Sequence, residues 1–312
     1  MSTDGDTPVG RVAAAYDRLI GRFVTWAEAE PDVRAAFVVG SRARVDTPAD
    51  EWSDLDLVIV MTDPNRLLRR SEWLRNLGTV WVTYLEPTAV GAGMERRVLF
   101  EGGLDVDFVP TPLDLTTQIA EHGWPSDLVA VARRGIRFVL DKDGLASRLP
   151  ALPEAPRPVP PSEDQYASTV DDFWYHTVWV AKKLRRGELW TAKMGCDGYL
   201  KGLILRMAEW HAGADSDWTR DTWHEGRFLD QWADPRVTAS LPDAFAHYDQ
   251  HDVVRALGVT MRLFRWLAVE TGERLGYAYP SETDRHTTAL VSDYLERSPS
   301  TRSTSAAPSS LS

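Results

Sequence analysis

The stretch Ala35-Ala36-Phe37-Val38-Val39-Gly40-Ser41-Arg42, followed after a loop by Ser53-Asp54-Leu55-Asp56-Leu57-Val58, decides how this chain folds. Its first half is an apolar run that stops at a Gly-Ser pair, which predicts a buried strand ending in a tight turn. Its second half opens another apolar run, residues 55–61, with two carboxylates. Because side chains alternate along a strand, we expect Asp54 and Asp56 on the same face.

These two carboxylates are candidate ligands of a metal ion. Neighbouring carboxylates repel each other unless a cation lies between them. Hard divalent cations such as Mg²⁺ bind carboxylate oxygens and often take substrate phosphates as further ligands. Gly40 lets the backbone approach a phosphate closely, and Ser41 offers it a hydroxyl and an N–H group.

A third strand-like run, Leu104-Asp105-Val106-Asp107-Phe108-Val109, carries two more carboxylates on one face. If it pairs near the strand of Asp54 and Asp56, three or four carboxylates converge, as in two-metal sites for in-line phosphoryl or nucleotidyl transfer. A Gly-Ser pair alone has no diagnostic value, and an Asp-x-Asp pair is more often a solvated edge or a cap. The ordered set of motifs is what indicates a catalytic site.

The ordered motifs resemble the nucleotidyltransferase superfamily and, within it, the aminoglycoside 6-adenylyltransferase (streptomycin adenylyltransferase) family. The Gly-Ser and Asp-x-Asp motifs mark only the superfamily. The motifs that resemble the narrower family extend over most of the chain: Val106-Asp107-Phe108 with Pro112-Leu113, Leu140-Asp141-Lys142-Asp143-Gly144, Asp172-Phe173-Trp174, Val180-Ala181-Lys182, residues 188–193 and Gly226-Arg227-Phe228-Leu229.

The resemblance implies an enzyme that uses Mg²⁺ to transfer AMP from ATP to a hydroxyl of an aminoglycoside such as streptomycin, at its 6-hydroxyl, and so gives antibiotic resistance. The residues themselves support nucleotidyl transfer and contain nothing that identifies streptomycin. A nucleotidyltransferase for another antibiotic or a biosynthetic intermediate is the alternative. Arg206 and His211, which bracket four residues of a predicted helix, leave a toxin–antitoxin-like RNase module as a weaker alternative. The intact carboxylates argue against a binding protein with a degenerate site.

Two sets of residues are expected to hold the metal and the nucleotide. The expected metal ligands are Asp54, Asp56 and Asp107. The residues expected at the ATP phosphates are Gly40, Ser41, Arg42 and, from the resemblance, Lys142. A surface salt bridge explains Arg42 equally well, and a lysine in a turn is usually solvated.

The attacking hydroxyl needs a base, and Asp107 is the first choice because crowded carboxylates raise one another's pKa. In the antibiotic adenylyltransferases that the chain resembles, a carboxylate of the second domain is the alternative, here Asp172. With His176 and Trp179, Asp172 has helical spacing beside an apolar stripe, which predicts an acceptor pocket for a cationic group. Simple packing explains His176 and Trp179 more economically, and His224 has no assigned role.

Composition bounds the class of protein and its partners. The chain has 312 residues, enough for two domains, and its 43% hydrophobic and 26% charged residues are ordinary for a soluble protein. A net charge of −11 argues against nucleic acid as the main partner and suits a cationic small molecule. The single Cys196 fits a reducing cytoplasm, and no apolar run has the length of a membrane span. We expect a cytoplasmic monomer.

The pattern of elements predicts an α+β fold in four parts. These are a nucleotidyltransferase domain (1–148) with a mixed sheet and flanking helices, a proline-rich linker (149–163), a C-terminal helical bundle that binds the acceptor (164–297) and a disordered tail (298–312). The predicted strands are 33–39, 55–61, 79–85, 97–101, 105–109 and 136–140. The predicted helices are 9–29, 65–76, 113–122, 126–134, 164–186, 191–212, 222–233, 252–271 and 281–297.

Overall fold

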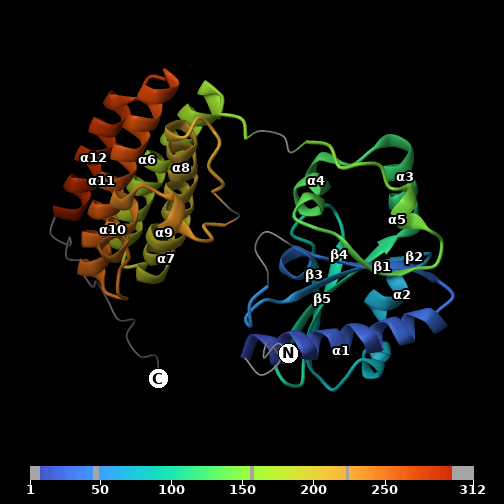
Figure 1. The fold of residues 1–312 in the computed structure, drawn as a ribbon. Helices are drawn as coiled ribbons and strands as arrows, with labels where there is room; N and C mark the ends of the chain where they lie inside the picture. The colour runs from blue at the N-terminus through green and yellow to red at the C-terminus, as the bar shows by residue number, and fades with distance from the viewer. Residues whose placement is uncertain (1–7, 45–48, 155–157, 223–224, 297–312) are drawn as a thin grey trace, which may run out of the picture. The chain divides into compact units, whose positions relative to one another are not determined.

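The computed structural model describes residues 8–44, 49–154, 158–222 and 225–296. The chain divides between residues 156 and 157 into two compact units, and each is described by itself. The first unit is a mixed sheet with helices, and the second is helical (Figure 1). The predicted α+β class is therefore confirmed. The predicted tail, 298–312, lies outside the described residues.

The first unit is organised around a six-stranded sheet of order β3-β4-β5-β2-β1-β6. Its strands are β1 (Val33–Val39), β2 (Leu55–Met61), β3 (Val80–Pro87), β4 (Met94–Phe100), β5 (Leu104–Pro112) and β6 (Arg137–Asp141). β2 and β5 are parallel neighbours, and the other neighbouring pairs are antiparallel. The strand that carries Asp107 thus lies directly beside the strand that carries Asp56.

Helices lie on both faces of this sheet. One face packs against α1 (Pro8–Ala29), α2 (Pro64–Arg69) and the 3₁₀ helix η3 (Glu72–Asn76), with alternate residues of β2 buried in that core. The other face meets α3 (Leu113–His122), α4 (Ser126–Arg133) and α5 (Leu145–Arg148), and Figure 1 shows α1 and these three helices on opposite sides of the strands. Since side chains alternate, the residues of β2 between the buried leucines face α3 and α4.

The predicted helix over 65–76 is wrong as a single element, because it divides into α2 and η3 at Arg70. The buried Arg96 of β4 donates hydrogen bonds to the carbonyls of Leu67, at 3.1 Å, and Leu68. The Trp73 indole donates to the carbonyl of Arg70 at 3.0 Å. These side chains take the carbonyls that a continuing α-helix would use for its own ladder.

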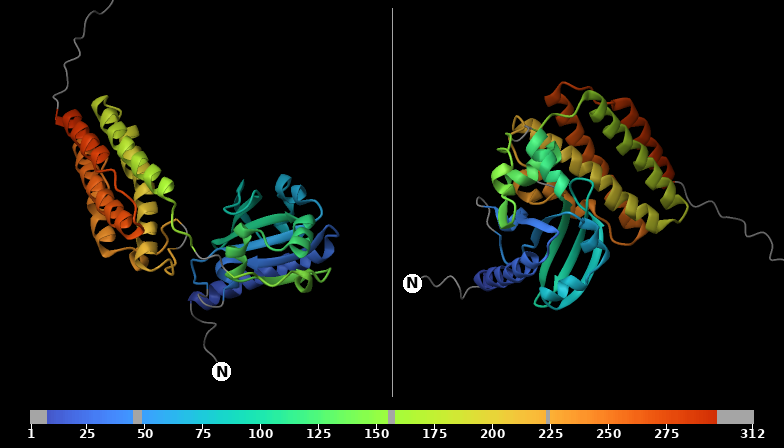
Figure 2. Two further views of the ribbon diagram at one scale, coloured as in Figure 1. Left: turned by 90° about the horizontal axis from the view of Figure 1, so that it is seen from above. Right: turned by 90° about the vertical axis from the view of Figure 1, so that its right-hand side faces the viewer.

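The second unit is a bundle whose long helices lie side by side (Figure 2). Its described elements are α6 (Glu163–Arg185), α7 (Leu189–Met194), the π-helical turn η4 (Gly195–Tyr199), α8 (Leu200–Asp215), α9 (Leu229–Trp232), α10 (Pro235–Ala244), α11 (Gln250–Leu275) and α12 (Ser281–Glu296). A capping box between Ser162 and Gln165 starts α6. Phe173 of α6 stacks on Phe264 of α11, with ring centroids 3.6 Å apart, in the centre of the core.

Two helix predictions for the second unit differ from the structure. The predicted helix 191–212 runs from 189 to 215 and contains the π turn. The predicted helix 222–233 is wrong: among the described residues only Leu229–Trp232 is helical, and Glu225 and Phe228 have φ of 56° and 55°. α10 was not predicted, although Pro235 stands near the first helical position, where a helix accepts proline.

Two further observations bear on the expected class of protein. Cys196 is free and buried. Within the described ranges, no helix is both long enough and apolar enough to cross a membrane.

Candidate active site

Asp54, Asp56 and Asp107 come together at one end of the β2–β5 pair. Each offers a carboxylate oxygen, and these oxygens all lie within 4.8 Å of one another. Asp56 stands opposite Asp107 in the parallel register, and Asp54 immediately precedes β2. The structure therefore brings together the three residues predicted as metal ligands, as strand alternation and pairing require.

Gly40 lies against this carboxylate group. It opens the 3₁₀ turn η2 (Gly40–Ala43) after β1, and its φ is +66°. A Cβ at this position would lie only 2.1 Å from Oδ2 of Asp56. Glycine is thus needed for two reasons, the left-handed backbone and the space that the Asp56 carboxylate fills.

Ser41 and Arg42 follow in the same turn. The Oγ of Ser41 is buried and has no hydrogen-bond partner in the described part of the chain, so it can accept or donate to a bound group. Arg42 donates to the carbonyls of Ser53 (2.5 Å) and Asp54 (2.9 Å), and its guanidinium lies 3.5 Å from the ring centroid of Tyr16. These contacts hold the backbone that presents Asp54 and explain Arg42 as a support for the site.

The carboxylates carry more negative charge than the neighbouring cation balances. Burial, with the charges of Asp54 and Asp107, raises the pKa of Asp56 to about 7. Burial and the charge of Asp107 likewise raise the pKa of Glu95 to about 7. Arg97 of β4 pairs with Asp107, with N–O distances of 2.6 and 2.7 Å.

These features fit a hard divalent cation. Three carboxylates supply oxygen ligands, their mutual repulsion favours a cation among them, and the unpartnered Ser41 hydroxyl lies in the adjoining turn. Oxygen ligands without nitrogen or sulfur are those of Mg²⁺ and similar ions. The group can therefore hold a metal together with phosphate oxygens.

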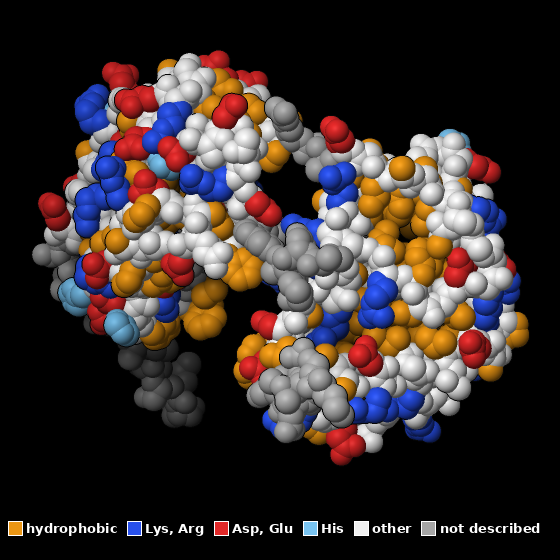
Figure 3. Space-filling view, in the orientation of Figure 1, with side chains coloured by type: hydrophobic (Ala, Val, Ile, Leu, Met, Phe, Trp, Pro, Cys, Tyr) orange, Lys and Arg blue, Asp and Glu red, His pale blue; other side chains and the backbone are white. Residues whose placement is uncertain are grey.

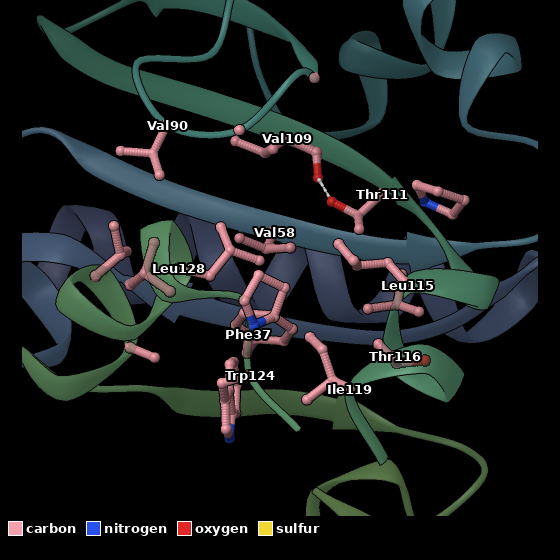
Figure 4. Close-up of a pocket in the computed structure, with 18 of the residues that line it drawn as sticks. Phe37, Val58, Val90, Val109, Thr111, Leu115, Thr116, Ile119, Trp124 and Leu128 are labelled. Carbon is pink, nitrogen blue, oxygen red and sulfur yellow. Dashed lines mark hydrogen bonds between the residues drawn. The ribbon is translucent and has the colours of Figure 1, made fainter. Parts of the chain in front are cut away.

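A cavity of about 640 Å³ opens on the same face of the sheet, between the strands and the helices α3 and α4. Val58 and Val109, which line it, are each two residues along their strand from Asp56 and Asp107. Figure 4 shows Phe37, Leu115, Leu128 and other apolar side chains around the space, and Figure 3 shows apolar side chains gathered around this hollow. The mostly apolar lining suits an uncharged group better than a cationic one.

Lys142 lies apart from the other residues predicted to bind phosphate. Its amino group donates to the carbonyls of Ala27 (2.8 Å), Glu28 (3.2 Å) and Glu30 (2.8 Å), so it caps the C-terminus of α1. Its own N–H bonds to Arg34, near the start of β1, whereas Gly40 follows the end of that strand. The structure therefore places Lys142 as a cap of α1, and does not bring it together with Gly40, Ser41 and Arg42.

Asp172, His176 and Trp179 form a cluster on α6 of the second unit. His176 Nδ1 lies 2.6 Å from Asp172 Oδ1, and the His176 and Trp179 ring centroids are 6.2 Å apart. Tyr199, at the end of the π turn, donates to the Asp172 carboxylate at 3.0 Å and packs on His176 at 4.3 Å between ring centroids. Aromatic rings beside a carboxylate can bind a cation.

The RNase alternative loses its key residue. His211 is buried, with 3% of its surface exposed, and its Nε2 lies 3.1 Å from Glu270 and 2.6 Å from Arg274. A buried histidine of α8 that contacts Glu270 and Arg274 of α11 is not placed to act on an RNA strand. His224 lies outside the described residues.

Three charged residues near Asp107 and one tyrosine of the α6 cluster were not predicted from the sequence. They are Glu86, Glu95, Arg97 and Tyr199. Alternation of Glu95 and Arg97 along a strand was a usable signal that both face the same side. The pairing of β4 beside β5, which brings Arg97 to Asp107, involves no local pattern.

A Gly-Ser turn beside three carboxylates on adjacent strands of a mixed sheet defines the nucleotidyltransferase class of enzyme. A model of the family described as streptomycin adenylyltransferase matches residues 15–297. The chain belongs to this family.

Individual relatives are similar over most of their length. An aminoglycoside 6-adenylyltransferase of Campylobacter jejuni is 23% identical over 281 residues, covering 88% of this chain and 92% of the relative. One of Bacillus subtilis (strain 168) is 23% identical over 274 residues, covering 83% and 90%. A crystal structure of an aminoglycoside 6-adenyltransferase from Bacillus subtilis covers 89% of this chain and 98% of its own, with 18% identity and a TM-score of 0.43.

Proposed function

We propose that this protein transfers AMP from ATP to a hydroxyl of an aminoglycoside, with the 6-hydroxyl of streptomycin as the first candidate. The observation that carries the proposal is the group of Asp54, Asp56 and Asp107 against the Gly40-Ser41 turn. Membership of the family and the names of the two relatives support the acceptor class. Another antibiotic or a biosynthetic intermediate is the alternative acceptor.

The three carboxylates are the proposed ligands of Mg²⁺. When bound there, the ion supplies charge stabilisation for the phosphorus oxygens and the leaving pyrophosphate. Gly40 and Ser41 are proposed to hold the β- and γ-phosphates, because the Ser41 hydroxyl has no partner among the described residues and the glycine adds no side chain to the turn. Arg42 contributes by fixing the backbone of Asp54.

The reaction is an in-line displacement at the α-phosphorus. The acceptor oxygen forms the new P–O bond as the bond to pyrophosphate breaks, and the hydroxyl proton passes to a carboxylate. Both oxygens of Asp107 accept hydrogen bonds from Arg97, and the bulky guanidinium hinders the approach of a substrate hydroxyl. We therefore propose Asp107 first as a metal ligand, with Asp107 and Asp172 both retained as candidate bases.

The cluster on α6 is the proposed acceptor site. Asp172 offers charge to a guanidinium or ammonium group, and His176, Trp179 and the additional Tyr199 offer aromatic surface. A cytoplasmic location and a monomeric state complete the proposal. The test is to incubate the protein with ATP, Mg²⁺ and a panel of aminoglycosides, detect the AMP adduct by mass spectrometry and locate it by NMR. An adduct of streptomycin at another hydroxyl would refute the proposed position.

A further inference from the structure

Arg97 occupies a central place among the acidic groups of the candidate site. It projects from β4, where it stands opposite Asp107 in the antiparallel register. Its Nε and Nη2 bind both oxygens of Asp107, at 2.7 and 2.6 Å, and Nη2 lies 3.9 Å from Asp54. The guanidinium thus already touches two of the three carboxylates that can hold a metal.

The same guanidinium has a third acidic contact, through Nη1. Nη1 lies 3.2 Å from Glu86 of β3, and Glu86 stands opposite Glu95 in the β3–β4 register. The Asp107 side chain is only 6% exposed, whereas those of Arg97 and Glu86 are 31% and 34% exposed. The Arg97 guanidinium therefore lies between the buried Asp107 carboxylate and the more exposed carboxylate of Glu86.

We propose that Arg97 is a substitute cation: it neutralises Asp107 while the metal is absent, and a divalent cation must displace it toward Glu86 and Glu95 to bind. This inference rests on the metal site of the proposed function and adds a residue that sets its metal affinity. A fork that engages both oxygens of a carboxylate competes with a metal for the same lone pairs. Its positive charge also opposes the approach of a second cation.

The test is a titration of the full-length protein with Mn²⁺, without ATP or acceptor, in which EPR measures the free ion. Arg97→Gln should bind Mn²⁺ at least about tenfold more tightly than the unmodified protein. The substitution removes a unit positive charge that lies within 4 Å of Asp107 and Asp54. Arg97→Lys, whose single amine leaves one oxygen of Asp107 free, should fall between the two. It also provides the comparison if the glutamine variant does not fold.

The matched control is Arg66→Gln. Arg66 binds Asp32 through the same two-point contact, with both distances 2.8 Å, beyond the opposite end of β2. Its loss should leave Mn²⁺ affinity unchanged. In an Asp107→Asn background, the effect of Arg97→Gln should shrink, because the two residues act on each other.

Weaker or unchanged Mn²⁺ binding by folded Arg97→Gln would overturn the inference, since Arg97 would then only orient Asp107. Absence of Mn²⁺ binding in all variants would overturn it as well. Tight Mn²⁺ binding without any nucleotide transfer would instead refute the proposed function and leave this inference standing.

Discussion

At the scale of single residues, Gly40 and Asp56 depend on each other. Gly40→Ala would place a methyl group 2.1 Å from the Asp56 carboxylate and strain a backbone at φ +66°. We expect at least about a hundredfold loss of nucleotidyl transfer, because an error of about 1 Å in a catalytic group has that effect. Initial rates and thermal unfolding of the variant measure the two effects separately.

The control for Gly40 is Gly144→Ala. Gly144 has the same φ of +66°, but a Cβ there meets only the Ser147 hydroxyl at 3.7 Å. It should show the cost of backbone strain, about 1 kcal/mol, with activity retained. Equal activity of the two alanine variants would show that the contact with Asp56 is unimportant.

Asp56 should make the metal-free protein sensitive to pH. Its folded pKa, about 7, exceeds the ordinary 3.8, so its contribution to stability is present below pH 4 and is lost as pH rises through 7. With a chelator present, Asp56→Asn should therefore be more stable than the unmodified protein at pH 8, by about 1–3 kcal/mol, and similar at pH 4. Urea unfolding at both pH values measures this, and a destabilised variant at pH 8 would contradict the charge argument.

At the scale of elements, the π turn η4 places Gly195 beneath α6. A Cβ at Gly195 would lie 2.7 Å from the Trp179 ring and 2.9 Å from Val180. Gly195→Ala should therefore destabilise the protein by about 1–3 kcal/mol through overpacking and change its total tryptophan emission, to which Trp179 contributes. Urea unfolding followed by tryptophan emission tests both effects.

Gly202→Ala is the matched control within α8, because a Cβ there meets nothing within 4 Å. This substitution should leave stability equal or raise it by up to about 1 kcal/mol, as expected inside a helix. If both variants unfolded alike, the close approach of η4 to Trp179 would not matter.

Elements with strong local patterns were predictable from the sequence. The bounds of β1 and β2 agree with the apolar runs, and their alternation explains why Asp54, Asp56 and Asp107 converge. The break between α2 and η3 was not predictable, because Arg96, from a strand distant in sequence, causes it. The role of Arg97 was not predictable for the same reason, because its contact with Asp107 depends on the pairing of β4 with β5.

Local sequence patterns also failed to predict α10 and the position of Lys142. α10 contains Pro235 and Pro242 and has no local pattern that predicts a helix, although Pro235 stands where a helix tolerates proline. Lys142 matches a motif of the family, but the carbonyl groups at the end of α1 hold its amino group. The contacts in the structure therefore agree with the position expected from the motif for the three carboxylates, but not for Lys142.

At the scale of the whole molecule, the residues proposed to carry the reaction are divided between the two units. The candidate metal site lies wholly in the first unit, and the cluster of Asp172, His176, Trp179 and Tyr199 lies wholly in the second. Net charge of −11 suits a cationic acceptor for such an enzyme. Metal-dependent transfer of AMP to an aminoglycoside is the claim on which these assignments converge.

The most direct test of that claim is pyrophosphate release from ATP and Mg²⁺ in the presence of streptomycin, with the Asp54→Ala/Asp56→Ala double variant beside the unmodified protein. We expect release that requires the acceptor and is lost in the folded double variant. Equal release by both proteins would contradict the carboxylate site. No release with any aminoglycoside, despite demonstrated ATP binding, would contradict the proposed acceptor class.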